Sequence, residues 1–138
     1  MKDPEHALLI IKMGRKDLKA MEGMKENLVF FDDEIFGFHA QQAVEKTLKA
    51  WLSLIGVEYH RTHDLQQLFM VLKQHGESIL PEFLSLMNLT NFAVQFRYES
   101  FEDLNFKLDR IEITQSVAKL VKHVEKLIQY KKVNNDKD

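Results

Sequence analysis

Hydrophobic side chains recur through most of the chain every three or four residues, the spacing that places them on one face of an α-helix. Asp3 followed by Pro4 is typical of a helix start, and so is Asp109 with Glu112 three residues later. Only five glycines and two prolines interrupt the pattern, so we expect long helices. The predicted helices cover residues 4–21, 33–55, 63–75, 81–96 and 110–130.

Single residues predict where several of these helices begin and end. Gly23 and Gly56 are expected to end the first two helices, because glycine readily adopts the left-handed conformation that closes many helices. Asp32 or Asp33 is expected to begin the second helix, and Thr62 to cap the third.

The predicted fourth helix is apolar around more than half of its circumference when successive residues are stepped by 100°. A helix of this kind is central in its bundle or lies in a dimer interface, so we expect a homodimer. Its apolar side chains are Phe83, Leu86, Met87, Leu89, Phe92, Ala93, Val94 and Phe96.

A chain of 138 residues fits one domain, and the helical pattern predicts an all-α, up-and-down antiparallel bundle of about five helices. We expect this domain over residues 1–130 and a polar, disordered tail over 131–138. No signal peptide or membrane span is recognisable, and cysteine is absent, which favours a cytoplasmic protein. The net charge of −2 gives no global attraction to nucleic acid, so binding RNA or a nucleotide would need a local basic patch.

Three motifs follow one another on this all-helical chain: "HAQQAVEKTLKAWL" at 39–52, "THDL" at 62–65 and "RY" at 97–98. In this order they resemble the HEPN domain, and the resemblance covers nearly the whole chain. HEPN domains are helical bundles that commonly dimerise, and many are encoded beside a minimal nucleotidyltransferase. The resemblance therefore implies a homodimeric partner subunit of a nucleotidyltransferase, in a toxin–antitoxin type of module, with a nucleotide or RNA as ligand.

Many HEPN domains are ribonucleases that use an arginine followed four to six residues later by a histidine. Arg97 stands in the matching place, but "YESFEDL" follows it, with Glu102 and Asp103 where the histidine would be. A carboxylate there repels phosphate and lacks the near-neutral pKa of histidine, so we expect no robust ribonuclease activity and assign no catalytic residue. The alternative is a ribonuclease toxin with a non-standard site that uses Arg97, Tyr98 and a carboxylate.

Arg97 also projects into the apolar arc of the predicted fourth helix, where an unpaired guanidinium is costly to desolvate. It therefore needs a carboxylate, for which Glu45 and Asp64 are the candidates, or the phosphate of a ligand. Glu45 lies at the edge of the apolar face of the second helix. We expect a polar cleft for a phosphate-bearing ligand, formed by Gln42, Glu45, Lys49, His63, Asp64, Arg97 and Tyr98.

Simpler interpretations exist for the same residues. Lys46 and Lys49 are expected to be solvated if there is no site, with Glu45 pairing with Lys49 one turn away. His60 and His63 are three residues apart but straddle a loop and a helix start, and no second cluster completes a metal site, so neither a metal nor another cofactor is expected. A helical interaction module without any ligand is the third functional alternative.

Overall fold

The computed structural model describes residues 2–59, 61–92 and 108–135, and within these ranges it contains helices and no strand. The all-α prediction is therefore confirmed. The helices are α1 (Pro4–Met24), α2 (Asp33–Ile55), α3 (Leu65–Gln74), α4 (Pro81–Leu84), the 3₁₀ helix η1 (Ser85–Phe92) and α5 (Arg110–Asn135).

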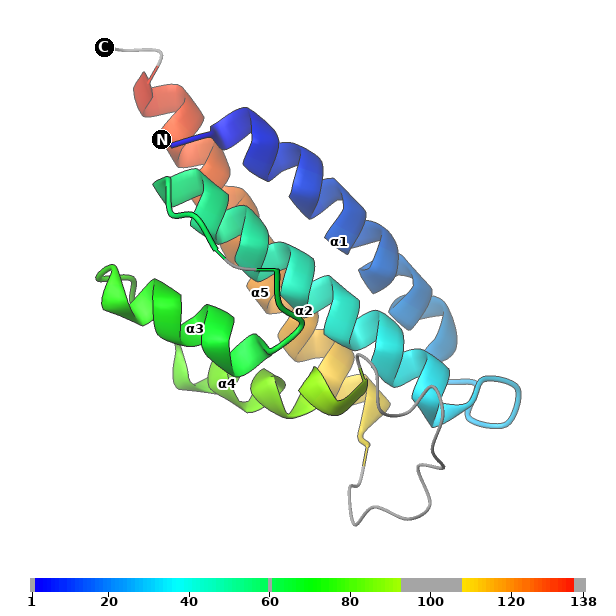
Figure 1. Cartoon of the computed structure of the whole chain (residues 1–138). Coiled ribbons are helices and arrows are strands. Elements are labelled where there is room, and N and C mark those ends of the chain that lie inside the picture. The colour runs from blue at the N-terminus through cyan, green and yellow to red at the C-terminus, as the bar shows by residue number, and fades with distance from the viewer. Residues whose placement is uncertain (1, 60, 93–107, 136–138) are drawn as a thin grey trace.

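Three long helices, α1, α2 and α5, form the body of the bundle, and α3 with α4 and η1 cover a further side of α2 (Figure 1). Helix α1 runs antiparallel to both of its long neighbours (Figure 1). Helices α2 and α5 run in the same direction (Figure 1). The start of α1 and the end of α5 consequently lie at the same end of the bundle (Figure 1).

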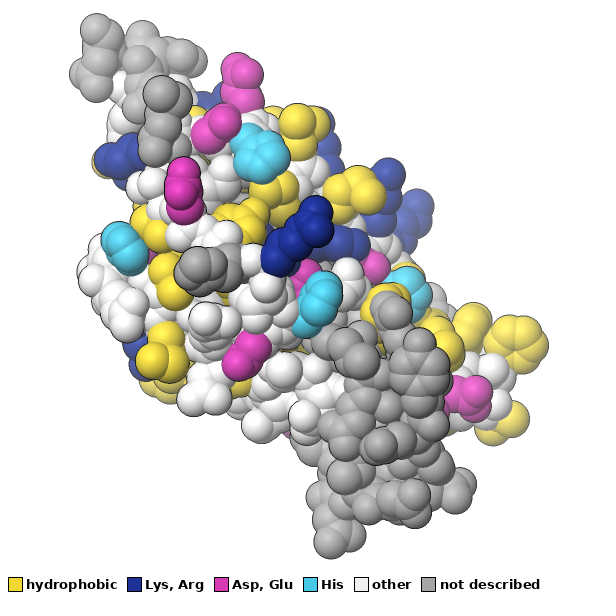
Figure 2. All heavy atoms as spheres, in the orientation of Figure 1, with side chains coloured by type: hydrophobic (Ala, Val, Ile, Leu, Met, Phe, Trp, Pro, Cys, Tyr) yellow, Lys and Arg dark blue, Asp and Glu magenta, His cyan; other side chains and the backbone are white. Residues whose placement is uncertain are grey.

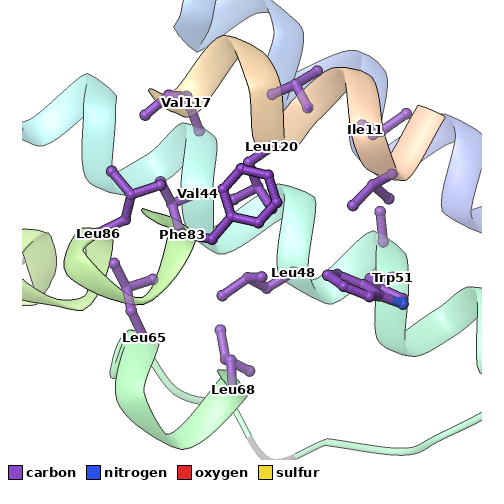
Figure 3. Packing of buried hydrophobic residues seen from close by; sticks show 14 of the residues in the cluster. Ile11, Val44, Leu48, Trp51, Leu65, Leu68, Phe83, Leu86, Val117 and Leu120 are labelled. Atoms are coloured by element: carbon purple, nitrogen blue, oxygen red, sulfur yellow. The ribbon is translucent and has the colours of Figure 1, made fainter. Parts of the chain in front are cut away.

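Helix α2 lies at the centre of the hydrophobic core. Val44 and Leu48 of α2 belong to one buried cluster with Leu65 of α3, Phe83 of α4 and Leu120 of α5 (Figure 3). Each fully buried side chain of this size stabilises the fold by roughly 1.5–3 kcal/mol relative to exposure. The apolar stripes that predicted the helices are therefore also the surfaces that hold them together.

Several predicted helix ends are confirmed. The Asp3 side chain accepts a hydrogen bond from the backbone N–H of His6 (2.9 Å), and that of Asp109 accepts one from the N–H of Glu112 (3.1 Å). Gly56 closes α2 with a left-handed φ of 77°.

Other predicted ends are wrong. Helix α1 continues through Gly23 to Met24, since a glycine inside a helix is tolerated when tertiary contacts hold its neighbours. Asp64, not Thr62, caps α3, while the Thr62 hydroxyl accepts a hydrogen bond from the Asp64 N–H (3.0 Å). Helix α5 continues to Asn135, so residues 131–135 are helical rather than part of a disordered tail.

The predicted fourth helix differs in type. It is α-helical only over Pro81–Leu84 and then becomes the 3₁₀ helix η1, while residues 93–96 lie outside the described residues. A 3₁₀ helix repeats every three residues. Apolar side chains three apart consequently share one face, and all of them are buried: Phe83, Leu86, Leu89 and Phe92. Over the described residues 81–92 the 3₁₀ repeat replaces the 100° geometry from which the wide apolar arc was predicted, and the homodimer itself stays a prediction.

A close approach fixes the end of η1 against α2. The ring of Phe92 packs directly on Gly37, where an added Cβ would stand 2.3 Å from the ring. Glycine is required at this position because any side chain would displace the ring.

The connection between α1 and α2 is held by Arg110, the first residue of α5. Its guanidinium donates to the backbone carbonyls of Met24 (3.0 Å), Asn27 (3.3 Å) and Phe31 (2.5 Å) and forms two hydrogen bonds with the carboxylate of Asp33 (2.9 and 3.0 Å). We call this group the Arg110 centre. It joins the starts of α2 and α5 and fixes the path of the chain that enters α2.

Candidate functional site

A buried carboxylate lies in the middle of α2. Glu45 is only 5% exposed and accepts hydrogen bonds from Gln41 Nε2 (2.9 Å), His63 Nδ1 (2.7 Å) and Lys49 Nζ (3.1 Å). We call these four residues the Glu45 centre. A charged group at this depth is tolerated because several donors replace the water that it has lost.

The sequence builds this centre in two ways. Gln41, Glu45 and Lys49 are four residues apart, so successive turns of α2 place them on one face. His63 comes from the segment between α2 and α3, which runs back along α2 (Figure 1). Gln41 Nε2 also donates to the backbone carbonyl of His63 (3.2 Å), and Gln42 Nε2 donates to Gln41 Oε1 (2.7 Å). The side-chain amides thus fix the returning segment on the helix.

The electrostatics of the centre keep Glu45 ionised. Burial alone raises the pKa of Glu45, but the hydrogen bonds from Gln41 and His63 and the charge and hydrogen bond of Lys49 outweigh it, so its pKa lies below the usual value. Burial, together with the negative charge of Glu45, raises the pKa of Tyr59. The Lys49 ammonium lies 5.7 Å from the centre of the Tyr59 ring, within the range of a cation–π contact.

The centre opens to solvent on one side. The Lys49 side chain is 16% exposed and that of His63 is 61% exposed, whereas that of Glu45 is 6% exposed. Lys49 gives one of its three N–H bonds to Glu45. His63 turns Nδ1 inward, and its Nε2 has no hydrogen-bond partner among the described residues. Among the described residues, two N–H bonds of Lys49 and the second ring nitrogen of His63 therefore have no partner and are left for a ligand.

A second polar group joins α1 to α2 on a different face of α2. Asp17 of α1 is 8% exposed, and its carboxylate accepts from Lys46 Nζ (2.7 Å) and lies 2.9 Å from His39 Nδ1. The interpretation of Lys46 as a merely solvated lysine is therefore wrong. Its contact ties two helices together and is separate from the Glu45 centre.

The structure brings together four of the predicted site residues, Gln42, Glu45, Lys49 and His63. The Asp64 side chain instead caps α3, accepting from the Gln66 N–H (3.0 Å). The other predicted members, Arg97 and Tyr98, lie outside the described residues, as do Glu102 and Asp103.

The residues predicted for the site did not include Gln41, Tyr59 or Arg110, which the structure places in the Glu45 centre, beside it and in the Arg110 centre. Nothing in the sequence pattern singled out Tyr59. Arg110 could have been found, because it continues the buried stripe of Thr114, Val117 and Val121 toward the start of the helix. The predicted pair of Glu45 with Lys49 is confirmed.

No group of three histidine or acidic residues that could hold a metal ion occurs among the described residues, and His60 lies outside them. No helix in the described part of the chain is long and apolar enough to cross a membrane.

Known proteins place this chain in a family. The sequence model of the HEPN domain matches residues 7–134. The crystal structure of an archaeal HEPN homologue has a similar fold, with a TM-score of 0.62 and 22% sequence identity over 93% of this chain and 99% of that one. No curated protein matches the sequence significantly. Since the family match spans almost the entire described structure, the chain belongs to the HEPN domain family.

Proposed function

We propose that this HEPN protein is a nucleotide- or RNA-binding subunit that works with a minimal nucleotidyltransferase, and that a ligand phosphate binds beside Lys49 and His63. The observation that supports the proposal is the Glu45 centre. Its buried carboxylate orients the Lys49 ammonium and the His63 ring at a surface edge, where a phosphate can accept from Lys49 and, when the imidazole is protonated, from His63 Nε2. Arg97 and Tyr98 are expected to contribute further contacts.

Ligand titration on two lysine variants tests this proposal. Lys49→Ala should weaken binding of ATP, GTP or a short single-stranded RNA about tenfold or more, because a charge-assisted hydrogen bond is lost. Lys46→Ala is the matched control, since Lys46 lies on the same helix but contacts Asp17. The affinity of the Lys46→Ala variant for the ligand should stay within about twofold of the wild-type affinity. If the wild-type protein binds none of these ligands at millimolar concentration, the Glu45 centre has a structural role only.

We also propose that the protein is a homodimer, and the feature that supports it is an apolar loop rather than η1. Between α1 and α2, Leu28, Val29 and Phe30 are 65%, 96% and 76% exposed. Figure 2 shows hydrophobic side chains protruding at this end of the molecule. The Arg110 centre holds the loop, and the side chain of Asn27 accepts from the Phe30 N–H (3.0 Å). A fixed, exposed apolar surface is typical of a protein contact.

A two-fold contact fits this loop. A groove of about 520 Å³ lies beside it, lined by Leu28, Leu108 and Ile111 among others. The loop and the groove are neighbours on one surface. In a two-fold contact, each copy can therefore insert its loop into the groove of the other copy. Val29→Asp should convert the dimer into a monomer without unfolding it, as measured by light scattering. A wild-type protein that is a monomer at micromolar concentration contradicts the dimer.

The nucleotidyltransferase partner is proposed from membership of the HEPN family. A short reading frame with a nucleotidyltransferase motif beside the gene, whose product co-purifies with this chain, is the expected observation. Absence of both would favour the alternative of an interaction module with other partners.

One observation favours ribonuclease activity as a second candidate function. His63 has Nδ1 on a buried carboxylate and Nε2 on the exposed side of the ring, which is how a general base is commonly oriented. Incubating the purified protein with total RNA and no added metal separates the two functions. If the protein is only a binding subunit, the RNA should not be cleaved. Cleavage that persists through purification and is lost in His63→Gln but kept in Lys46→Ala would establish the second.

A further inference from the structure

Positive charge is concentrated on the last helix. Helix α5 carries six basic and two acidic side chains, although the whole protein has a net charge of −2. One of the six, Arg110, is buried in the Arg110 centre. The other five are lysines that reach the surface. The protein thus has a local basic region despite its acidic balance.

Three of these lysines share one face of α5. Lys119, Lys122 and Lys126 are three and four residues apart, so they follow one another along the helix, and Tyr130 continues the row one turn later. All four are exposed, Tyr130 by 65%. We call this row the α5 lysine face. It points away from the core, because the buried stripe of the helix occupies the other side.

The α5 lysine face adjoins a groove of about 510 Å³ between α1 and α5. Lys122, Lys126 and Lys132 line it, together with Gln129 and Leu8. None of the three lysines that line the groove forms an ion pair with a carboxylate among the described residues.

Acidic neighbours do little to neutralise this region. Glu125 lies at the groove, but Arg15 of α1 pairs with it, with Arg15 Nε 2.9 Å from Glu125 Oε2. Glu82 is 3.7 Å from Lys119, at the outer limit of an ion pair, with both side chains well exposed. Considering the described residues alone, the groove therefore presents uncompensated positive charge.

We propose that the α5 lysine face and this groove bind the phosphate backbone of single-stranded RNA, with Tyr130 stacking on a base. Lysines supply point charges for phosphates, and an exposed aromatic ring beside them is the usual platform for an unpaired base. Gln129 offers both a donor and an acceptor to a base or sugar. This surface is distinct from the Glu45 centre, since α5 lies behind α2 while the segment that carries His63 runs in front of it (Figure 1).

The inference rests on the RNA-binding part of the proposed function, and charge reversal tests it. Fluorescence anisotropy of a labelled single-stranded RNA is measured at several salt concentrations. Lys122→Glu with Lys126→Glu should weaken binding at least twentyfold and lower the slope of log affinity against log salt by about one per lysine. Tyr130→Ala should weaken it several-fold at unchanged slope.

Two controls make the result specific. Lys73→Glu reverses an exposed lysine on α3 and should change the affinity less than twofold. All the altered side chains are exposed, so thermal melting of the variants should match the wild type. Unchanged affinity in the double variant, an equal loss in Lys73→Glu, or competition by poly-glutamate as strong as by unlabelled RNA would each overturn the proposal.

Lys49→Ala in the same assay separates this inference from the function that it extends. Loss of RNA binding in Lys49→Ala with none in the double variant leaves the Glu45 centre as the site and removes the α5 lysine face. The reverse result keeps the α5 lysine face and removes the Glu45 centre as an RNA site. A wild-type protein that binds mononucleotides but no RNA also overturns the present inference, while the proposed function stands.

Discussion

The Arg110 centre and the Glu45 centre both bury a charge beside α2, but they differ in the groups that satisfy it. Arg110 donates to three backbone carbonyls and one carboxylate, and its guanidinium also lies 5.4 Å from the centre of the Phe36 ring. The partners that hold Glu45 are side chains, two of which reach solvent. Backbone acceptors cannot turn away, whereas side chains can exchange one partner for another. The first arrangement fixes the fold, and the second can serve a ligand.

The largest expected effect comes from removing the arginine. Arg110→Met should lower the free energy of unfolding by about 3–5 kcal/mol, because it leaves three backbone carbonyls without their donor and removes the ion pair with Asp33, whose side chain is 38% exposed. Urea unfolding measures the loss. Arg15→Met is the control: its exposed pair with Glu125 should contribute less than about 1 kcal/mol. Equal losses in both variants would show that the Arg110 centre is no more structural than a surface ion pair.

A smaller effect is expected at the Glu45 centre. Glu45→Gln keeps the volume but replaces an acceptor with an amide, so it should lower the free energy of unfolding by about 1–3 kcal/mol. It should also weaken nucleotide binding, because His63 and Lys49 lose the group that orients them. Binding measured on the folded fraction distinguishes the two centres: Arg110→Met should leave it unchanged. A Glu45→Gln variant with full stability and weaker binding would sharpen the contrast further.

The smallest effect is a dependence on pH. Since the pKa of Glu45 is lowered in the fold, its contribution to stability is complete above its unfolded value of about 4.5 and is lost as the pH falls through the folded value. The stability difference between wild type and Glu45→Gln should be constant from pH 7 to 5 and shrink below. Urea unfolding across this range checks it. A difference that grows toward low pH would contradict a lowered pKa.

The sequence predicted those parts of the molecule that depend on local spacing. Helical stripes and the Glu45–Lys49 pair arise within a few residues, so periodicity reveals them. The His63–Glu45 and Lys46–Asp17 contacts join residues 18 and 29 apart, and they require the path of a loop and the packing of two helices. The 3₁₀ geometry of η1 could not be predicted from a helical wheel, because the wheel assumes the 100° per residue of an α-helix, whereas a 3₁₀ helix turns about 120° per residue.

The distance along the chain that Arg110 bridges has a consequence for folding kinetics. Its hydrogen bonds reach back 77 to 86 residues, so they form only after a long loop has closed. The hairpin of α1 and α2 needs no such closure and can form early. We therefore expect Arg110→Met to accelerate unfolding and to leave the folding rate nearly unchanged. Stopped-flow measurements that instead show slower folding would place the docking of α5 in the folding nucleus.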